Sequence, residues 1–243
     1  MGWLDNFLNK PLFKKTRPDF PPAAWKEPKS ELELLERHIG LSFEKQIDFG
    51  DYIGQCGWDI DLEAGTIAFG DRLLANIQVI GRFAYFNNSW LWAWAAEQVI
   101  IPQPLLVDAL AIRSFGEQHE IRRFQQSTYP VQIDELHNFG MIAVGMFGAD
   151  AYFMGDYGQG VGLFTVKNEA LRNHRKDSTD RIFTTFPQIA ANFNVDHRQA
   201  LRCYLMDKGY ILDEQKTKVI GSKGKEKCLA TFDKHGRLLT LKS

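Results

Sequence analysis

The 243-residue chain has only three cysteines, and no two of them form a C-x-x-C pair. Cys56, Cys203 and Cys228 lie far apart, which argues against a disulfide framework and against a zinc site. No apolar run approaches the roughly 20 residues that span a bilayer. The first residues also lack the apolar core and cleavage site of a secretory signal. We therefore expect a cytoplasmic protein without metal, cofactor or transmembrane segment.

The chain also lacks a large net charge of either sign, because its formal charge at pH 7 is −1. The charges are unevenly placed, however. Residues 1–169 contain 14 Lys and Arg against 22 Asp and Glu, whereas residues 170–243 contain 15 against 8. A basic segment of this kind can bind nucleic acid or an acidic partner, and it can equally reflect attraction between the two halves.

Motifs typical of enzymes are absent: we find no G-x-S-x-G, no H-E-x-x-H and no Walker loop. The glycine-rich stretch 155–162 is followed by a strand-like run rather than by a helix, so it predicts a bulged hairpin and not a phosphate loop. Glu117, His119 and His137 remain as catalytic candidates, since a carboxylate and an imidazole can perform acid–base chemistry. Glu-x-His is a common pattern, and the sequence favours a protein that is not an enzyme.

Residues 89–96 hold half of the six tryptophans, at every second position. This spacing predicts a strand with Trp90, Trp92 and Trp94 on one face, closing a sheet and leading into a helix. Exposed, the three indoles would be a binding surface on which bases, sugars or a partner's side chains could stack. Covered, they would be core, which is favoured because three exposed indoles make a large apolar patch.

The elements around this strand predict an α+β main domain over residues 30–168. Ser30 has the features of a helix N-cap, and alternating apolar residues from Asp48 onward indicate strands joined by tight turns. Helices are expected from Pro102 and over 133–147, followed by a hairpin over 151–166. The fold class is therefore an antiparallel β-meander backed by two helices.

The two ends of the chain differ from this domain. Residues 1–29 read as an amphipathic arm and a proline-rich linker; residues 1–15 could make a weak membrane-surface contact, dock a partner or fold back onto the body. Residues 178–243 predict a small basic domain. Its two helices, 179–193 and 196–208 with Asp196 as N-cap, resemble a helix-turn-helix. They precede a short β-sheet with strands expected near Lys218, Leu229 and Leu239.

A helix-turn-helix suggests DNA binding, and the second helix carries residue types that read bases and phosphates: His197, Arg198, Gln199 and Arg202. Lys223, Lys225 and Lys227 could form an accompanying wing. The second helix ends early, at Gly209, and two-helix units with small sheets also serve as dimerisation or docking modules. Both interpretations stay open.

Three segments have distinctive motifs: the W-x-W-A-W-A stretch at 90–95, the F-G-E-x-H stretch at 115–119 and the A-D-A-Y hairpin that begins at Ala149. They resemble the corresponding segments of a bacterial family of unknown function. The resemblance covers about residues 43–166 and implies the same fold without assigning any chemistry. Members of the family usually have Asn where this chain has Ala96.

Taken together, these features predict a non-catalytic cytoplasmic bacterial binding protein, with an immunity-like or antitoxin-like adaptor as its most concrete form. The acidic body would suit a basic protein partner. One alternative is nucleic-acid binding through residues 170–243. Another is a small-molecule enzyme built around Glu117, His119 and His137.

Overall fold

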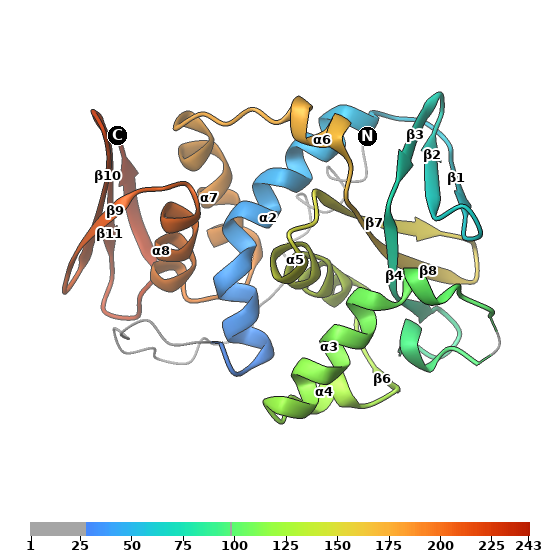
Figure 1. Ribbon diagram of the computed structural model, residues 1–243. Coiled ribbons are helices and arrows are strands. Elements are labelled where there is room, and N and C mark those ends of the chain that lie inside the picture. The colour runs from blue at the N-terminus through green and yellow to red at the C-terminus, as the bar shows by residue number, and fades with distance from the viewer. Residues whose placement is uncertain (1–27, 98) are drawn as a thin grey trace. The chain divides into compact units, whose positions relative to one another are not determined.

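The structure, a computed structural model, describes residues 28–97 and 99–243 (Figure 1). The predicted arm and nearly all of the predicted linker lie outside the described residues. The fold is α+β with antiparallel sheets, as the sequence predicts. The chain forms two compact units, here called the central unit (residues 45–175) and the split unit (residues 28–44 and 176–243).

Helix α2 (Glu31–Ile53) contributes residues to both units, with the division between Glu44 and Lys45. Ser30 caps it as predicted, since its hydroxyl accepts a hydrogen bond from the Glu33 amide at 3.2 Å. The helix continues well past Asp48, where we expected strands to begin. That expectation is wrong because Phe49 and Ile53, four residues apart, are both buried on one helical face. The predicted domains also differ from these units, because the first part of α2 belongs with the C-terminal segment.

The central unit contains two separate sheets rather than one meander. The first has the order β1-β2-β3, formed by Trp58–Asp61, Thr66–Phe69 and Arg72–Ala75. The second has the order β6-β5-β4-β8-β7, formed by Thr128–Pro130, Ser89–Trp92, Ile77–Ala84, Gly160–Val166 and Ala151–Asp156. Asn76, with φ of 60°, lies between β3 and β4. This left-handed residue separates β3 from β4.

The tryptophan strand β5 is shorter than predicted and is not an edge. It pairs with β4 as expected, but β6 pairs with its other side. The chain then turns into the short 3₁₀ helix η1 (Ala93–Ala95), so Trp94 leaves the strand and does not share a sheet face with Trp90 and Trp92.

Helices complete the central unit. The predicted helix over 133–147 is confirmed as η3 and α5, and the predicted hairpin over 151–166 is confirmed as β7–β8. The helix expected from Pro102 is α3, which starts later, at Val107, after the 3₁₀ turn η2. The bounds are η2 (Gln103–Leu105), α3 (Val107–Gln118), α4 (Arg122–Gln125), η3 (Ile133–Glu135), α5 (Leu136–Phe147) and α6 (Glu169–His174).

The split unit places α7 (Asp180–Asn192) and α8 (His197–Asp207) beside the first part of α2 and a four-stranded sheet. Asp196 caps α8 as predicted, accepting from the Gln199 amide at 2.9 Å. The sheet has the order β12-β11-β10-β9, formed by Leu238–Lys242, Glu226–Phe232, Lys218–Lys223 and Ile211–Gln215. Strand β9 is not among the predicted strands.

None of the helices in the described ranges 28–97 and 99–243 has both the length and the apolar character that crossing a bilayer requires.

Candidate functional site

Trp90 and Trp92 belong to the core of the central unit. Their side chains are 0% and 1% exposed, and both rings pack on Phe139 of α5, with centroids 5.2 and 5.5 Å away. Trp94 is half-buried, and the Arg113 guanidinium lies 4.6 Å from its ring centroid. The proposed binding surface of three indoles is therefore wrong for Trp90 and Trp92, and the core interpretation holds for them.

Glu117, His119 and His137 have separate partners. The exposed Glu117 carboxylate pairs with Arg113 one turn earlier at 2.9 Å, and the His119 ring stacks on Phe115 with centroids 4.1 Å apart. His137 is buried, and its Nδ1 is hydrogen-bonded to the Tyr152 hydroxyl at 2.6 Å. Burial lowers the pKa of His137 to about 3, so this imidazole is neutral at physiological pH. The geometry does not assemble these residues into an acid–base site.

The helix-turn-helix side chains are largely engaged within the split unit. His197 is buried, and its Nδ1 accepts from the Leu238 amide at 3.0 Å. Arg198 donates to the carbonyls of Gln215 and Lys216, at 2.6 and 2.7 Å. A helix whose arginine and histidine are used in this way has few groups left to read bases.

The other two residues of α8 that were predicted to contact DNA also have intramolecular partners. Arg202 forms an ion pair with Glu214 at 2.7 Å, and Gln199 contacts the Cys203 sulfur at 3.7 Å. Of the predicted wing, Lys223, Lys225 and Lys227 are all exposed, and the Lys223 ammonium lies 5.9 Å from the ring centroid of Tyr210. These three exposed lysines are thus in the β10–β11 hairpin rather than on α8.

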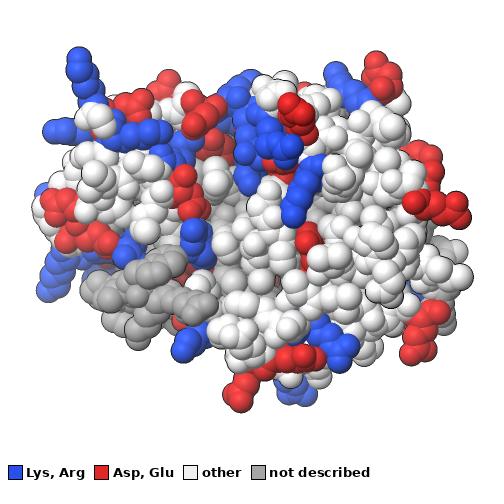
Figure 2. All heavy atoms as spheres, in the orientation of Figure 1, with Lys and Arg blue, Asp and Glu red and all other residues white. Residues whose placement is uncertain are grey.

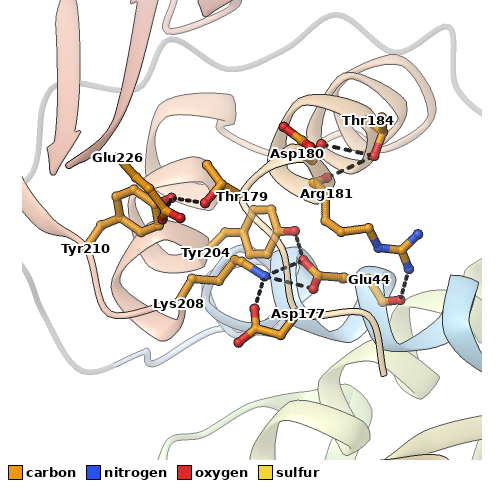
Figure 3. A network of polar contacts seen from close by, with 10 residues as sticks. All are labelled: Glu44, Asp177, Thr179, Asp180, Arg181, Thr184, Tyr204, Lys208, Tyr210 and Glu226. Atoms are coloured by element: carbon orange, nitrogen blue, oxygen red, sulfur yellow. Dashed lines mark hydrogen bonds and ion pairs between the residues drawn. The ribbon is translucent and has the colours of Figure 1, made fainter. Parts of the chain in front are cut away.

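A buried polar network connects α2 to α8 within the split unit (Figure 3). Lys208 Nζ lies 2.9 Å from Glu44 Oε1, 3.2 Å from Glu44 Oε2 and 2.8 Å from Asp177 Oδ1. The Tyr204 hydroxyl donates to the same Glu44 carboxylate. Sequence reasoning missed this network because its members are up to 164 residues apart.

The protonation states in this network argue for a structural role. Burial alone would lower the pKa of Lys208, but its hydrogen bonds to Asp177 and Glu44 outweigh burial and raise it. Burial, the Glu44 charge and its hydrogen bond raise the pKa of Tyr204. Lys208 is therefore cationic and Tyr204 is a neutral phenol at pH 7. Neither group can act as a base, and the network fixes α8 against α2.

Acidic side chains gather on the β1–β2–β3 sheet, as the red atoms over β1 and β2 show (Figure 2, right). Asp59, Asp61, Glu63 and Asp71 are all exposed. Asp61 Oδ1 accepts from the Ala64 amide at 2.9 Å, which fixes the turn between β1 and β2. Within residues 28–97 and 99–243, no group of three or more His, Cys, Asp or Glu side chains is placed to hold a metal ion.

The chain belongs to a family of unknown function, DUF6882, whose model matches residues 32–169. This confirms the resemblance of the tryptophan, F-G-E-x-H and A-D-A-Y segments to an uncharacterised family. The match runs from α2 to the start of α6 and leaves residues 170–243 outside it. Comparisons with curated proteins and with solved structures gave no match.

Proposed function

We propose that this DUF6882 protein is a non-catalytic binding protein of the bacterial cytoplasm, in the manner of an immunity or antitoxin-like adaptor. Its central unit would hold a basic protein partner on the outer face of the β1–β2–β3 sheet. The observation that supports this proposal is an exposed acidic sheet face whose carboxylates form no ion pair with any side chain in residues 28–97 and 99–243.

Strand pairing defines the face. Ile67 and Phe69 on β2 and Leu74 on β3 are buried, so they mark the inner side of this sheet. By alternation, the outer side carries Asp59 and Asp61 on β1, Thr66 and Ala68 on β2, and Leu73 on β3. The small central side chains lie between a row of carboxylates and Leu73, which is 66% exposed.

The sequence segment that forms the face contains few positive charges. Arg72 is the only cation in residues 54–81, which contain four carboxylates. Its guanidinium lies 5.1 Å from the ring centroid of Tyr52 and donates to the Ile53 carbonyl at 3.3 Å. The wider unit is acidic too, with 15 Asp and Glu against nine Lys and Arg over residues 45–175. Such a surface favours encounter with a basic partner and disfavours an acidic one.

The geometry gives less support to nucleic-acid binding by α8 and to catalysis. The arginines and the histidine of α8 are engaged in the split unit, so DNA reading by this helix has no supporting contact. Glu117, His119 and His137 have separate partners, so the catalytic proposal lacks an assembled site.

Charge reversal tests the proposal. The whole chain would be used to capture partners from the cytoplasm, and the captured protein would then be purified and its Kd measured. We expect a basic partner whose binding weakens at least about tenfold in Asp59→Lys/Glu63→Lys and weakens with added salt. Asp61 is left intact because it holds the turn.

The matched control is Glu97→Lys/Glu169→Lys, which makes the same change in net charge on exposed positions elsewhere in the central unit. Equal loss in both double variants would reveal a non-specific charge effect. A partner that is acidic, or that binds the Asp59→Lys/Glu63→Lys variant unchanged, would refute this function.

A further inference from the structure

Within residues 28–97 and 99–243, the four-stranded sheet of the split unit has one face that is covered and one that is open. Val219, Gly221, Cys228 and Ala230 are buried and point to the same side. A Cβ added to Gly221 would lie 3.2 Å from both Leu205 and Tyr210, so this side packs on α8 and the turn that follows it. The alternate residues of β10 and β11 must therefore point away from the helices.

The register of the sheet gives the pattern of this open face, here called the basic sheet face. Ile220 on β10 lies opposite Leu229 on β11, and the two form its centre. Three rows run across the strands from β9 towards β12: Ile211, Ser222 and Lys227; then Asp213, Ile220, Leu229 and Lys242; then Gln215, Lys218, Thr231 and Thr240.

The centre of the face is aliphatic and its surroundings are basic. Ile211 is 81% exposed at the edge strand β9, beside half-buried Ile220 and Leu229. Lys218, Lys227 and Lys242 are exposed around them, against the single carboxylate of Asp213. In the described part of the chain, none of these three lysines takes part in an ion pair, so their charge is available to a partner.

We propose that the basic sheet face docks an amphipathic helix of a protein partner, with the helix's apolar side on Ile211, Ile220 and Leu229 and its acidic flanks beside the lysines. The occupant follows from complementarity: aliphatic side chains need apolar ones, and unpaired lysines need carboxylates. Two strand spacings give about 10 Å, close to the diameter of a helix.

Nucleic acid fits this face less well than an acidic helix. Single strands bind on aromatic side chains, and the basic sheet face has none among its residues. Tyr210 contacts Gly221 on the covered side, and Phe232 of β11 is buried. Asp213, in the row of Ile220 and Leu229, would repel phosphates. This inference is independent of the basic partner proposed for the central unit.

Binding of defined probes to the full-length protein tests the inference. The probe is a fluorescent helical peptide of about 18 residues with Leu on one side and Glu elsewhere, compared with the same peptide carrying Lys for Glu and with a single-stranded oligonucleotide. Fluorescence anisotropy should show binding of the Glu peptide that weakens with salt, and much weaker binding of the other two probes.

Variants then locate the site. Ile211→Ser and Lys227→Glu should each weaken binding of the Glu peptide, about tenfold or more in combination. Lys234→Glu, an equal charge change at an exposed turn, should leave binding within about twofold of wild type. Ile211 is so exposed that its replacement should not impair folding, and circular dichroism would verify this. Asp59→Lys/Glu63→Lys should also retain binding, which separates this surface from that of the central unit.

Three results would overturn the inference: no binding of the Glu peptide, equal binding of the Lys peptide, or Glu-peptide binding unaffected by Ile211→Ser and Lys227→Glu. Preferential binding of the oligonucleotide, lost in Lys227→Glu, would instead assign this face to nucleic acid.

Discussion

Two helical glycines, Gly40 and Gly140, each lie against an aromatic side chain. A Cβ at Gly40 would come within 2.2 Å of the Tyr204 Cβ, and one at Gly140 would come within 2.5 Å of the Tyr152 ring. Real Cβ atoms do not approach other atoms so closely. Glycine at these positions therefore permits α2 to pack on α8 in the split unit, and α5 to pack on β7 in the central unit.

Gly40→Ala should destabilise the split unit although alanine is the better helix former. Its propensity would favour the folded state by about 1 kcal/mol. Overpacking costs about 1–3 kcal/mol, and here the opposing atom is a Cβ that cannot move without the backbone. The 2.2 Å approach puts the overpacking cost in the upper part of this range, so we expect a net loss of up to about 2 kcal/mol, seen as faster amide hydrogen exchange in α8. Gly57→Ala is the control, since no atom lies within 4 Å of its added Cβ, and it should change stability little.

His137 should make the central unit sensitive to acid. Its pKa falls from 6.5 to about 3 on folding because the ring is buried, so the unfolded chain takes up a proton below pH 6.5 that the folded chain refuses. The stability that depends on a neutral His137 is complete above pH 6.5 and decreases as the pH falls towards 3. Between pH 7 and pH 5 this group alone should cost about 2 kcal/mol.

Urea unfolding at pH 7 and pH 5, followed by tryptophan fluorescence, measures this effect. Trp58, Trp90, Trp92 and Trp94 all lie in the central unit. His137→Gln should be less stable at pH 7 but should lose about 2 kcal/mol less than wild type on acidification. An identical pH dependence in the two proteins would show that His137 is accessible to protons in the folded state.

Helix α8 has the predicted form of the second helix of a helix-turn-helix, but its basic side chains contact its own sheet instead of being available to DNA. Its N-cap and length follow the predicted pattern, yet Arg198 and Arg202 interact with the β9 strand and the turn after it. Glu214 lies within reach of both guanidinium groups, at 3.8 and 2.7 Å. The unpredicted strand β9 is thus the element that covers the presumed recognition surface.

Asp196→Ala should lower the stability of the split unit by about 1 kcal/mol. The change removes the acceptor for the Gln199 amide, one of the otherwise unpaired donors in the first turn of α8. Hydrogen exchange of that amide, together with the thermal midpoint from circular dichroism, measures the effect. Asp196→Asn keeps an acceptor and should lose only a few tenths of a kcal/mol; an equal loss in both variants would mean that charge, not capping, is what matters.

Sequence patterns within single segments correctly predicted several helices, hairpins and caps. They could not predict which distant segments pair with one another. The helical stripe over 133–147, the hairpin over 151–166 and the Asp196 cap depend on neighbours in sequence, and all are confirmed. The insertion of β8 next to β4 depends on contacts between residues about 80 positions apart, which alternation cannot reveal. For the same reason the sequence indicated an acidic body but not the face on which Asp59 and Leu73 lie together.

For the whole molecule, the important feature is that the split unit is discontinuous in sequence. Residues 36, 37, 40 and 43 of α2 contact residues beyond 176: Glu36 bonds the Asp196 amide, Arg37 pairs with Asp207, Gly40 contacts Tyr204 and Phe43 contacts Phe193. The family match includes this part of α2 but not residues 170–243. A description of residues 178–243 as a free-standing domain would therefore omit one of its core helices.

A fragment of residues 178–243 should not fold alone. Without α2, Tyr204 and Phe193 lose their packing partners and would be exposed, a cost of several kcal/mol for a unit of this size. Its amide NMR spectrum should be poorly dispersed, and adding a peptide of residues 28–44 should restore dispersion. A well-dispersed spectrum of the fragment alone would contradict this account.

The same discontinuity has a consequence for biosynthesis. The ribosome delivers the α2 residues of the split unit before the 131 residues of the central unit, and only afterwards the residues that pack on Gly40 and Phe43, such as Tyr204 and Phe193. Until then, the apolar side of the first half of α2 is exposed, and it is accessible to chaperones or to another nascent chain. A transcript truncated before codon 176 would yield a chain in which this apolar side is never covered. Such a chain should be degraded by proteases.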